Sequence, residues 1–352
     1  MRAITSSERN ELIAQLQDLL TDGLVCVVGS GYSVGHGLPG MPELSNHLVD
    51  TIPPQVSGND ATQWEAVQSL IEEGKGLEPA LHSAHVSDTL LNSITETTAK
   101  FMDSAEHRAL AEIASGDNQG TFGHFADHFL KSSRILHVVT PNYDRIIEHE
   151  VEIAGIGVDT GYVGTYVGVQ DAMRSALSYR EYVQDGRRVR LIVYPHVRLY
   201  KPHGSLDWYV VGNRVIRSAQ CLEEPRAIIA PGGTKYRDGY QEHFDVQRTA
   251  AADRLGKTNR VLAIGYGFND DQLEHRWCPG LTTDKHVVLM TKVLTENALQ
   301  LLMQNESVLA LYEGRVDERK VTVVHRGGQE PAWLPEDMWT LAGYCKEVIG
   351  NA

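Results

Sequence analysis

Three apolar segments of this chain each end in a short run of glycine or polar residues, and this repeated pattern constrains the fold most. Residues 24–28 (LVCVV) run directly into GSGYS at 29–33. Residues 135–139 run into TPNYD at 140–144, and 197–201 run into PHGS at 202–205. Short apolar runs bounded by turn residues are typical of buried strands. A parallel sheet would bring all three ends to one edge, where ligands bind in such folds.

The order of the other segments predicts an α/β fold. Further strands are predicted at 190–194, 227–230, 260–264, 286–290 and 320–325. Helical patterns are predicted at 8–20, 43–50, 143–153, 245–255, 270–276, 294–304 and 335–348. Strands that alternate with helices indicate βαβ units, and apolar strands without alternation indicate a sheet covered on both faces. We therefore expect a Rossmann-like, doubly wound parallel sheet.

The domain organisation is predicted from the segments where strands and helices do not alternate. Residues 60–132 show helical spacing without a strand signal, so we expect a helical layer inserted after the first strand. Residues 320–352 are expected to form a C-terminal strand and helix. Because no linker or repeat divides the chain, residues 1–352 are expected to form a single domain.

Charge restricts the class of ligand. The chain has 352 residues and a formal net charge of −14, which argues against a general nucleic-acid binder. An anionic small molecule is not excluded, because backbone N–H groups bind anions locally. The most basic window, 180–201, contains Gly186 and is expected to form a hairpin. A solvated face or a subunit contact fits this window better than a nucleic-acid groove.

The cysteines and apolar runs restrict metal binding and location. The four cysteines lie far apart, at Cys26, Cys221, Cys278 and Cys345, so the spacing predicts no zinc module and no metal site. No apolar run approaches the roughly 20 residues of a membrane span, and the first residues lack the apolar core of a signal peptide. We expect a cytoplasmic protein with no membrane contact.

The polar ends of the strands supply the candidate site residues. The turn at 29–35 has the spacing G-x-G-x-x-x-G, which allows close approach to a phosphate but is not the G-x-G-x-x-G dinucleotide fingerprint. Asn142 and Asp144 could equally cap a helix. His203 could be satisfied by backbone at a strand end. The GYGFND turn at 265–270 could hold part of a dinucleotide or be only a capped glycine turn.

Taken together, these motifs resemble the sirtuin superfamily over roughly residues 20–290. The turn at 29–33 is followed by GLP at 37–39, then by T-x-N-x-D at 140–144 and HG at 203–204. The NYD, HGS and GYGFND sequences are most similar to the sirtuin-like domains of bacterial antiphage defence systems. The D-F-R sequence and the zinc cysteines of deacylases are not matched here, which puts acyl-lysine recognition in doubt.

The resemblance implies an NAD+ glycohydrolase that cleaves NAD+ to ADP-ribose and nicotinamide as an abortive-infection effector. It makes Asn142 and His203 the catalytic residues, and Asp144 the residue that holds the nicotinamide carboxamide. The residues that it implies for the diphosphate and the adenosine side are Gly29, Ser30, Gly31, Ser33, Gly265, Gly267 and Asp270. The alternatives are a sirtuin-type deacylase or a non-catalytic NAD- or ADP-ribose-binding subunit.

The resemblance also extends to partners. A stand-alone protein of this length is similar to the subunit that accompanies a HerA-type hexameric ATPase in defence systems, and self-assembly into a homo-oligomer is expected. NAD+ is expected as the substrate, without a metal.

Overall fold

The central strand β2, Val25–Val28, is buried at all four positions, and the main sheet of this computed structural model extends on both sides of it. The structure describes residues 1–352 except 117–119, 232–240, 271–272, 275–277, 279–284 and 351–352. The strands of the sheet, in spatial order, are β1 (Arg2–Ala3), β17 (Ala332–Leu334), β16 (Arg319–Arg326), β15 (Val308–Val316), β14 (His286–Thr291), β13 (Arg260–Ile264), β2, β3 (Ile135–Val139), β9 (His196–Tyr200) and β4 (Gly157–Asp159). From β15 to β4 neighbouring strands are parallel, whereas β16 is antiparallel to both β15 and β17.

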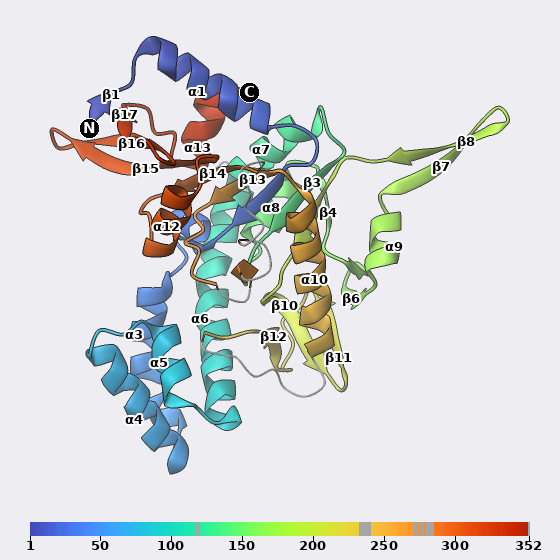
Figure 1. The fold of residues 1–352 in the computed structure, drawn as a ribbon. Helices are drawn as coiled ribbons and strands as arrows, with labels where there is room; N and C mark the ends of the chain where they lie inside the picture. The colour runs from blue at the N-terminus through green and yellow to red at the C-terminus, as the bar shows by residue number, and fades with distance from the viewer. Residues whose placement is uncertain (117–119, 232–240, 271–272, 275–277, 279–284, 351–352) are drawn as a thin grey trace.

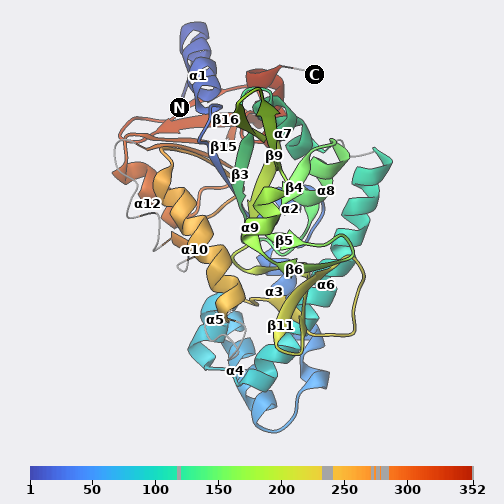
Figure 2. The same cartoon turned by 90° about the vertical axis from the view of Figure 1, so that its right-hand side faces the viewer.

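Alternate residues of β2 enter two different cores, which explains why the strand is apolar throughout. Cys26 and Val28 pack in the core beneath α1, α7 and α8, whereas Val25 and Val27 pack in the core beneath α10 and α12. Figure 2 shows helices on both sides of the sheet. The helices are α1 (Ser6–Leu19), α7 (Thr121–Leu130), α8 (Ile146–Ile153), α10 (Gln241–Lys257) and α12 (Glu296–Gln304). This arrangement confirms the predicted doubly wound α/β fold.

A helical layer occupies the connection from β2 to β3. After the short α2 (Ser30–Gly35), this layer contains α3 (Met41–Thr51), a 3-10 turn (Pro53–Gln55), α4 (Asn59–Glu72), α5 (Leu77–Ala84) and α6 (Asp88–Ser115). It has a core of its own, formed around the buried Trp64, Leu48 and Leu81. The predicted range 60–132 includes most of α4 and all of α5 and α6, and α3 lies where a helix was predicted at 43–50; the layer lies below the main sheet in Figure 1.

A second, antiparallel sheet and a separate hairpin follow β4. The sheet has the order β12 (Arg226–Ile228), β10 (Gly204–Val211), β11 (Arg214–Ser218), β6 (Val167–Gln170) and β5 (Tyr162–Val163). Helix α9 (Ala172–Leu177) leads into the hairpin of β7 (Arg180–Asp185) and β8 (Arg188–Val193), which projects from the body (Figure 1). Gly186 lies in its turn with φ +59°, so the predicted hairpin is confirmed. The sequence pattern missed β10 and β11.

The C-terminal helix is shorter than predicted. The expected helix at 335–348 begins only at α13 (Leu341–Tyr344) and continues as a π-helix over Cys345–Ile349. Residues 336–338 instead bind β16, because Thr322 Oγ1 donates to the carbonyl of Glu336 and accepts from the amide of Met338. The predicted helix at 270–276 lies largely outside the described residues. Within the part of the chain that the structure describes, no helix has the length and apolarity to cross a membrane.

Candidate functional site

The strand order brings four loops together at the carboxyl edge of the sheet. Strands β13, β2, β3 and β9 are neighbours and parallel, so the loops at 265–270, 29–33, 140–144 and 201–205 leave the same edge. The chain moves outward from β2 to β3 and β9, then returns to the other side of β2 as β13. The carboxyl ends of β2 and β13 therefore flank a topological switch point, where open α/β sheets bind ligands.

The glycines at this point pack against each other. The amide of Gly31 donates to the carbonyl of Gly265 over 2.9 Å, and the amide of Gly29 donates to the carbonyl of Ile264 over 2.9 Å. A Cβ on Gly265, which has φ +58°, would lie 2.5 Å from the amide nitrogen of Tyr32. These glycines allow β2 and β13 to meet closely, and the amides of Gly29 and Gly31 are used inside the protein rather than facing a phosphate.

The side chain of Asn142 is fixed on this turn. Its Nδ2 donates to the carbonyl of Gly29 over 3.0 Å and to Oγ of Ser33 over 2.9 Å. A carbonyl can only accept, so the group that faces Gly29 must be the NH2, and Oδ1 points elsewhere. No protein donor among the described residues bonds to Oδ1. The side chain is half-buried and presents one acceptor.

Asp144 is connected to Asn142 through the hydroxyl of Ser33. Oγ of Ser33 donates to Oδ2 of Asp144 over 2.7 Å, and the amide of Ile146 donates to Oδ1 over 3.3 Å. Both Ser33 and Asp144 are buried. Burial raises the pKa of Asp144, and the charge of Lys201 opposes that rise. The carboxylate thus accepts from the first amide of α8, although Arg145 is the N-cap residue of that helix, and it faces Ser33 rather than the surface.

A buried lysine holds the main chain beside Asn142. Lys201, at the end of β9, is 2% exposed, and its Nζ donates to the carbonyl of Asp144. The same Nζ lies 2.9 Å from Oε1 of Glu148 and 3.1 Å from Oγ of Ser205. Burial raises the pKa of Glu148, whereas the charge of Lys201 lowers it. Lys201 is a site residue that the sequence prediction missed, although it stands two residues before His203.

His203 lies against an acidic residue from another loop. Its Nε2 is 3.2 Å from Oδ2 of Asp270, and 17% of its side chain is exposed. Burial lowers the pKa of His203, Asp270 raises it, and Arg248 lowers it. The imidazole is therefore neutral at neutral pH. The main-chain carbonyl of His203 accepts a hydrogen bond from the amide of Ile229 over 2.9 Å. The carbonyl of Ile229 in turn accepts a hydrogen bond from the hydroxyl of Tyr143.

The structure thus makes two groups from the predicted residues. One contains Asn142, Ser33 and Asp144, and the other contains His203 and Asp270. Asn142 and His203 make no hydrogen bond to each other in the described part of the chain, and they are joined through Tyr143 and the main chain at 229. Asp270 was expected on the adenosine side, but it lies beside the imidazole.

The remaining predicted residues are less central. Ser30 is exposed beside the glycine turn. Gly267 lies against Thr295, whose Oγ1 donates to the Gly267 carbonyl. Arg248 of α10 was missed, since an arginine within a helical pattern carries no motif. It is 6% exposed and lies close enough to His203 for its charge to lower the pKa of that imidazole.

The donor chemistry does not indicate a metal. Within the described ranges, no group of three or more His, Cys, Asp or Glu side chains is arranged to hold an ion. Among the described residues, the four cysteines form no disulfide, and Cys26 and Cys345 are buried.

Comparisons with known proteins identify part of the chain. Residues 136–305 match the family described as SIR2-like domain. A Sir2 homologue in complex with NAD is 12% identical, with 88% of this chain and 90% of that chain covered and a TM-score of 0.42. A mutant Sir2 homologue with 2′-O-acetyl ADP-ribose is 11% identical, with 82% and 87% covered and a TM-score of 0.41.

A search of curated proteins found no match. The matched range contains the loops after β3, β9 and β13, whereas the glycine turn at 29–33 lies before it. Residues 136–305 of this chain are therefore similar to a SIR2-like domain, and they lie within a doubly wound α/β fold.

Proposed function

We propose that this protein is an NAD+ glycohydrolase, which cleaves NAD+ to ADP-ribose and nicotinamide. The observation that carries the proposal is that a fixed carboxamide, Asn142, and an imidazole beside a carboxylate, His203, lie in the loops that follow the adjacent strands β3 and β9 at one edge of the sheet. Further support comes from the SIR2-like domain and from the order of the motifs. An NAD complex is also known for a protein of similar fold.

The reaction needs little acid catalysis. Nicotinamide leaves as a neutral base from a cationic pyridinium, so positive charge moves onto the ribose, as in other glycoside cleavages. Because both N–H bonds of Asn142 are engaged by Gly29 and Ser33, its Oδ1 is the atom that would accept a hydrogen bond from the attacking water. Ser33 and Asp144 keep that amide in a single orientation.

His203 would take the proton. Its lowered pKa keeps the imidazole neutral and able to accept a proton from water or from a ribose hydroxyl. Asp270 would orient the ring and stabilise the imidazolium that forms, as a carboxylate does for other catalytic histidines. In this proposal Asp270 therefore orients His203 and is not assigned to the adenosine side.

The diphosphate needs positive charge or hydrogen-bond donors near the glycine turn. The amides of Gly29 and Gly31 are engaged with β13. We assign the diphosphate to the exposed Ser30 and to the cation of Arg248, which lies near His203. Asp144 is buried beneath Ser33, so its contribution to nicotinamide binding would be indirect, through Asn142.

The test is nicotinamide release from NAD+ by the purified full-length protein. Asn142→Ala and His203→Ala should each lower kcat at least a hundredfold, in line with the usual contribution of a positioned proton acceptor, ~10²–10⁴-fold. Asn142→Asp should be as inactive, because a carboxylate cannot donate to the Gly29 carbonyl. His107→Ala and Asn259→Ala, at exposed positions, are the matched controls. Equal release by parent and site variants would overturn the proposal, and turnover of an acetylated peptide instead would indicate a deacylase.

We further propose a role in antiphage defence, as an abortive-infection effector that accompanies a HerA-type ATPase. Support comes from the similarity of the loop motifs to sirtuin-like defence proteins and from the cost to a cell of NAD+ depletion. Co-expression with such an ATPase, followed by measurement of cellular NAD+ after infection, tests it. NAD+ levels that do not depend on His203 during infection would exclude this role.

A further inference from the structure

The β7–β8 hairpin projects from the molecule with little burial of its own. Two residues, Gly186 and Arg187, close it, and Figure 1 shows it extending away from the sheets. All but one residue of each strand are exposed, including Tyr182 at 67% and Val189 at 62%. A two-stranded ribbon alone is marginally stable in water. The arm therefore needs a surface to pack against in order to be stably folded.

One face of the arm is mainly apolar. Opposite residues of an antiparallel pair share a face, so the pairs Arg180–Val193, Tyr182–Leu191 and Gln184–Val189 lie on one side. The pairs Glu181–Ile192, Val183–Arg190 and Asp185–Arg188 lie on the other. Apolar residues at every second position are the pattern of a strand with one buried face. Nevertheless, Tyr182, Leu191 and Val189 are exposed in this chain.

The base of the arm is fixed, so the arm is held outward. The ring of Tyr179 stacks on His196 with centroids 4.3 Å apart, and the amide of Tyr194 donates to the Tyr179 carbonyl over 2.9 Å. Beside the base, Met173 and Leu177 of α9 are also exposed, at 72% and 43%. The helix that precedes the arm therefore also exposes apolar side chains.

Charge indicates what covers this face. The arm carries four arginines, Arg180, Arg187, Arg188 and Arg190, against two carboxylates, whereas the whole chain has a formal net charge of −14. The positively charged arm is therefore attracted to a second copy of the chain, which carries a net negative charge. Nucleic acid would also attract the arginines, but the remainder of the chain would repel it, and bases do not account for an apolar ribbon face.

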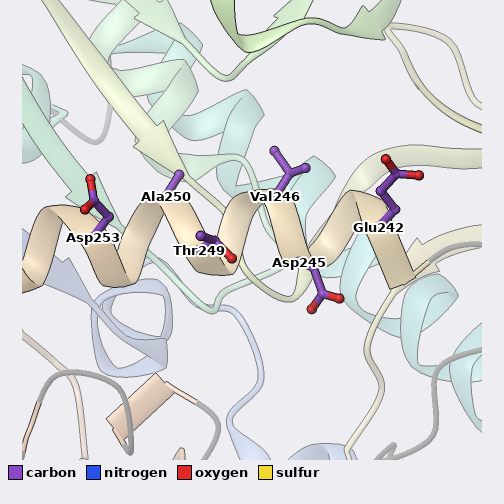
Figure 3. A pocket seen from close by; sticks show the side chains of 6 residues that line it. All are labelled: Glu242, Asp245, Val246, Thr249, Ala250 and Asp253. Carbon is purple, nitrogen blue, oxygen red and sulfur yellow. The ribbon is translucent and has the colours of Figure 1, made fainter.

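The outer face of α10 offers matching chemistry. The side chains of Glu242, Asp245, Val246, Thr249, Ala250 and Asp253 of this helix line a shallow, open pocket on its surface (Figure 3). Its three carboxylates are exposed, and Val246 is 40% exposed. The stretch from Glu242 to Asp253 is about 17 Å long, close to the roughly 20 Å of a six-residue strand.

We propose that the β7–β8 arm of one chain docks on the α10 face of a second copy. Arg180, which shares the mainly apolar face, and Arg187, in the turn, would meet Glu242, Asp245 and Asp253, and the apolar residues of that face would cover Val246. Because the two surfaces differ, the contact is heterologous, and it closes either as a reciprocal pair or as a ring. Asp245 lies 3.7 Å from Arg248, which is assigned to the diphosphate above, so the test leaves Asp245 unchanged and substitutes only Glu242 and Asp253 on α10.

The test is the solution mass of the full chain by light scattering at low ionic strength. We expect the parent to be oligomeric, and to dissociate as salt screens the charges. Arg180→Glu/Arg187→Glu should give a monomer, and so should Glu242→Lys/Asp253→Lys on α10. Mixing these two variants should restore association into a complex that contains both, because the acidic arm of one fits the basic helix of the other and the unchanged arm and helix still fit each other. Arg315→Glu/Arg319→Glu, on exposed positions of β15 and β16, is the charge-matched control.

Four results would overturn the proposal. They are a parent that is monomeric at every concentration, an arm variant that keeps the parental mass, two variants that fail to associate on mixing, and duplex DNA binding that the arm variant loses. Recovery of association only in the mixture would support it, because misfolded single variants could not recover together.

Discussion

Nδ2 of Asn142 donates a hydrogen bond of 2.9 Å to Oγ of Ser33, and the same hydroxyl donates to Asp144 over 2.7 Å. This chain of two bonds ties the loop after β3 to helix α2. It fixes the amide of Asn142 by means of a buried carboxylate that never needs to touch a ligand. The positioning of the proposed catalytic amide thus depends on a serine from a different part of the fold.

Ser33→Ala should therefore affect both stability and activity. Removing the hydroxyl leaves Oδ2 of buried Asp144 without its donor, which costs about 1–3 kcal/mol of unfolding free energy. It also frees the Asn142 amide to rotate, so kcat should fall while KM changes little. Urea unfolding and nicotinamide release measure the two effects. Ser104→Ala, on an exposed turn of α6, should change neither, and an unchanged kcat in Ser33→Ala would show that the relay does not position Asn142.

The loss of activity at low pH should follow the protonation of His203. Burial lowers its pKa from the ordinary value of about 6.5, so the neutral base should persist, and activity with it, to a lower pH than for an exposed histidine. Asp270→Asn should move this loss further down in pH, because Asp270 raises this pKa. Arg248→Met should move it up, because Arg248 lowers it. Shifts in the same direction for both variants would show that another group titrates.

Two glycines should respond in opposite ways to alanine. Gly265 has φ +58° and its Cβ would lie 2.5 Å from the Tyr32 amide nitrogen, so Gly265→Ala should destabilise by more than about 1 kcal/mol. Gly256 lies near the end of α10 with nothing within 4 Å of its Cβ. Gly256→Ala should stabilise by about 0.4–1 kcal/mol. Thermal unfolding distinguishes them, and a tolerated alanine at 265 would contradict the close contact of β2 and β13.

Lys201→Met should leave Glu148 as a buried carboxylate without its ion-pair partner. Breaking such a pair costs about 3–5 kcal/mol. Because Lys201 lowers the pKa of Glu148, its loss should raise that pKa further, so the folded state should bind a proton more readily than the unfolded state. The destabilisation should then be smaller at acid pH and grow as pH rises.

The double variant Lys201→Met/Glu148→Gln is the control for that prediction. It should recover much of the lost stability and abolish the added pH dependence, since no uncompensated charge remains. Denaturant unfolding at several pH values measures both. A single variant whose loss does not vary with pH would show that the lysine acts only by packing.

Much of the fold was predictable from the sequence because its signals are local. The apolar strands β2, β3 and β13 are short runs that end at glycine or polar residues, and each lies where the pattern placed it. Strand β10 was missed because it begins at Gly204, inside a segment that was read as a loop. The helix predicted at 335–348 is shortened because Thr322, from another strand, binds residues 336 and 338.

By itself, the sequence determined which residue types stand at the carboxyl ends of the strands, because strand and turn preferences depend on neighbours in the chain. Only the tertiary structure decided which of these side chains meet. Asn142 is 109 residues from Ser33, and the pairing of Asp270 with His203 depends on β13 returning to the far side of β2. Burial, which lowers the pKa of His203 and raises that of Asp144, likewise arises only when distant segments cover these groups and remove water.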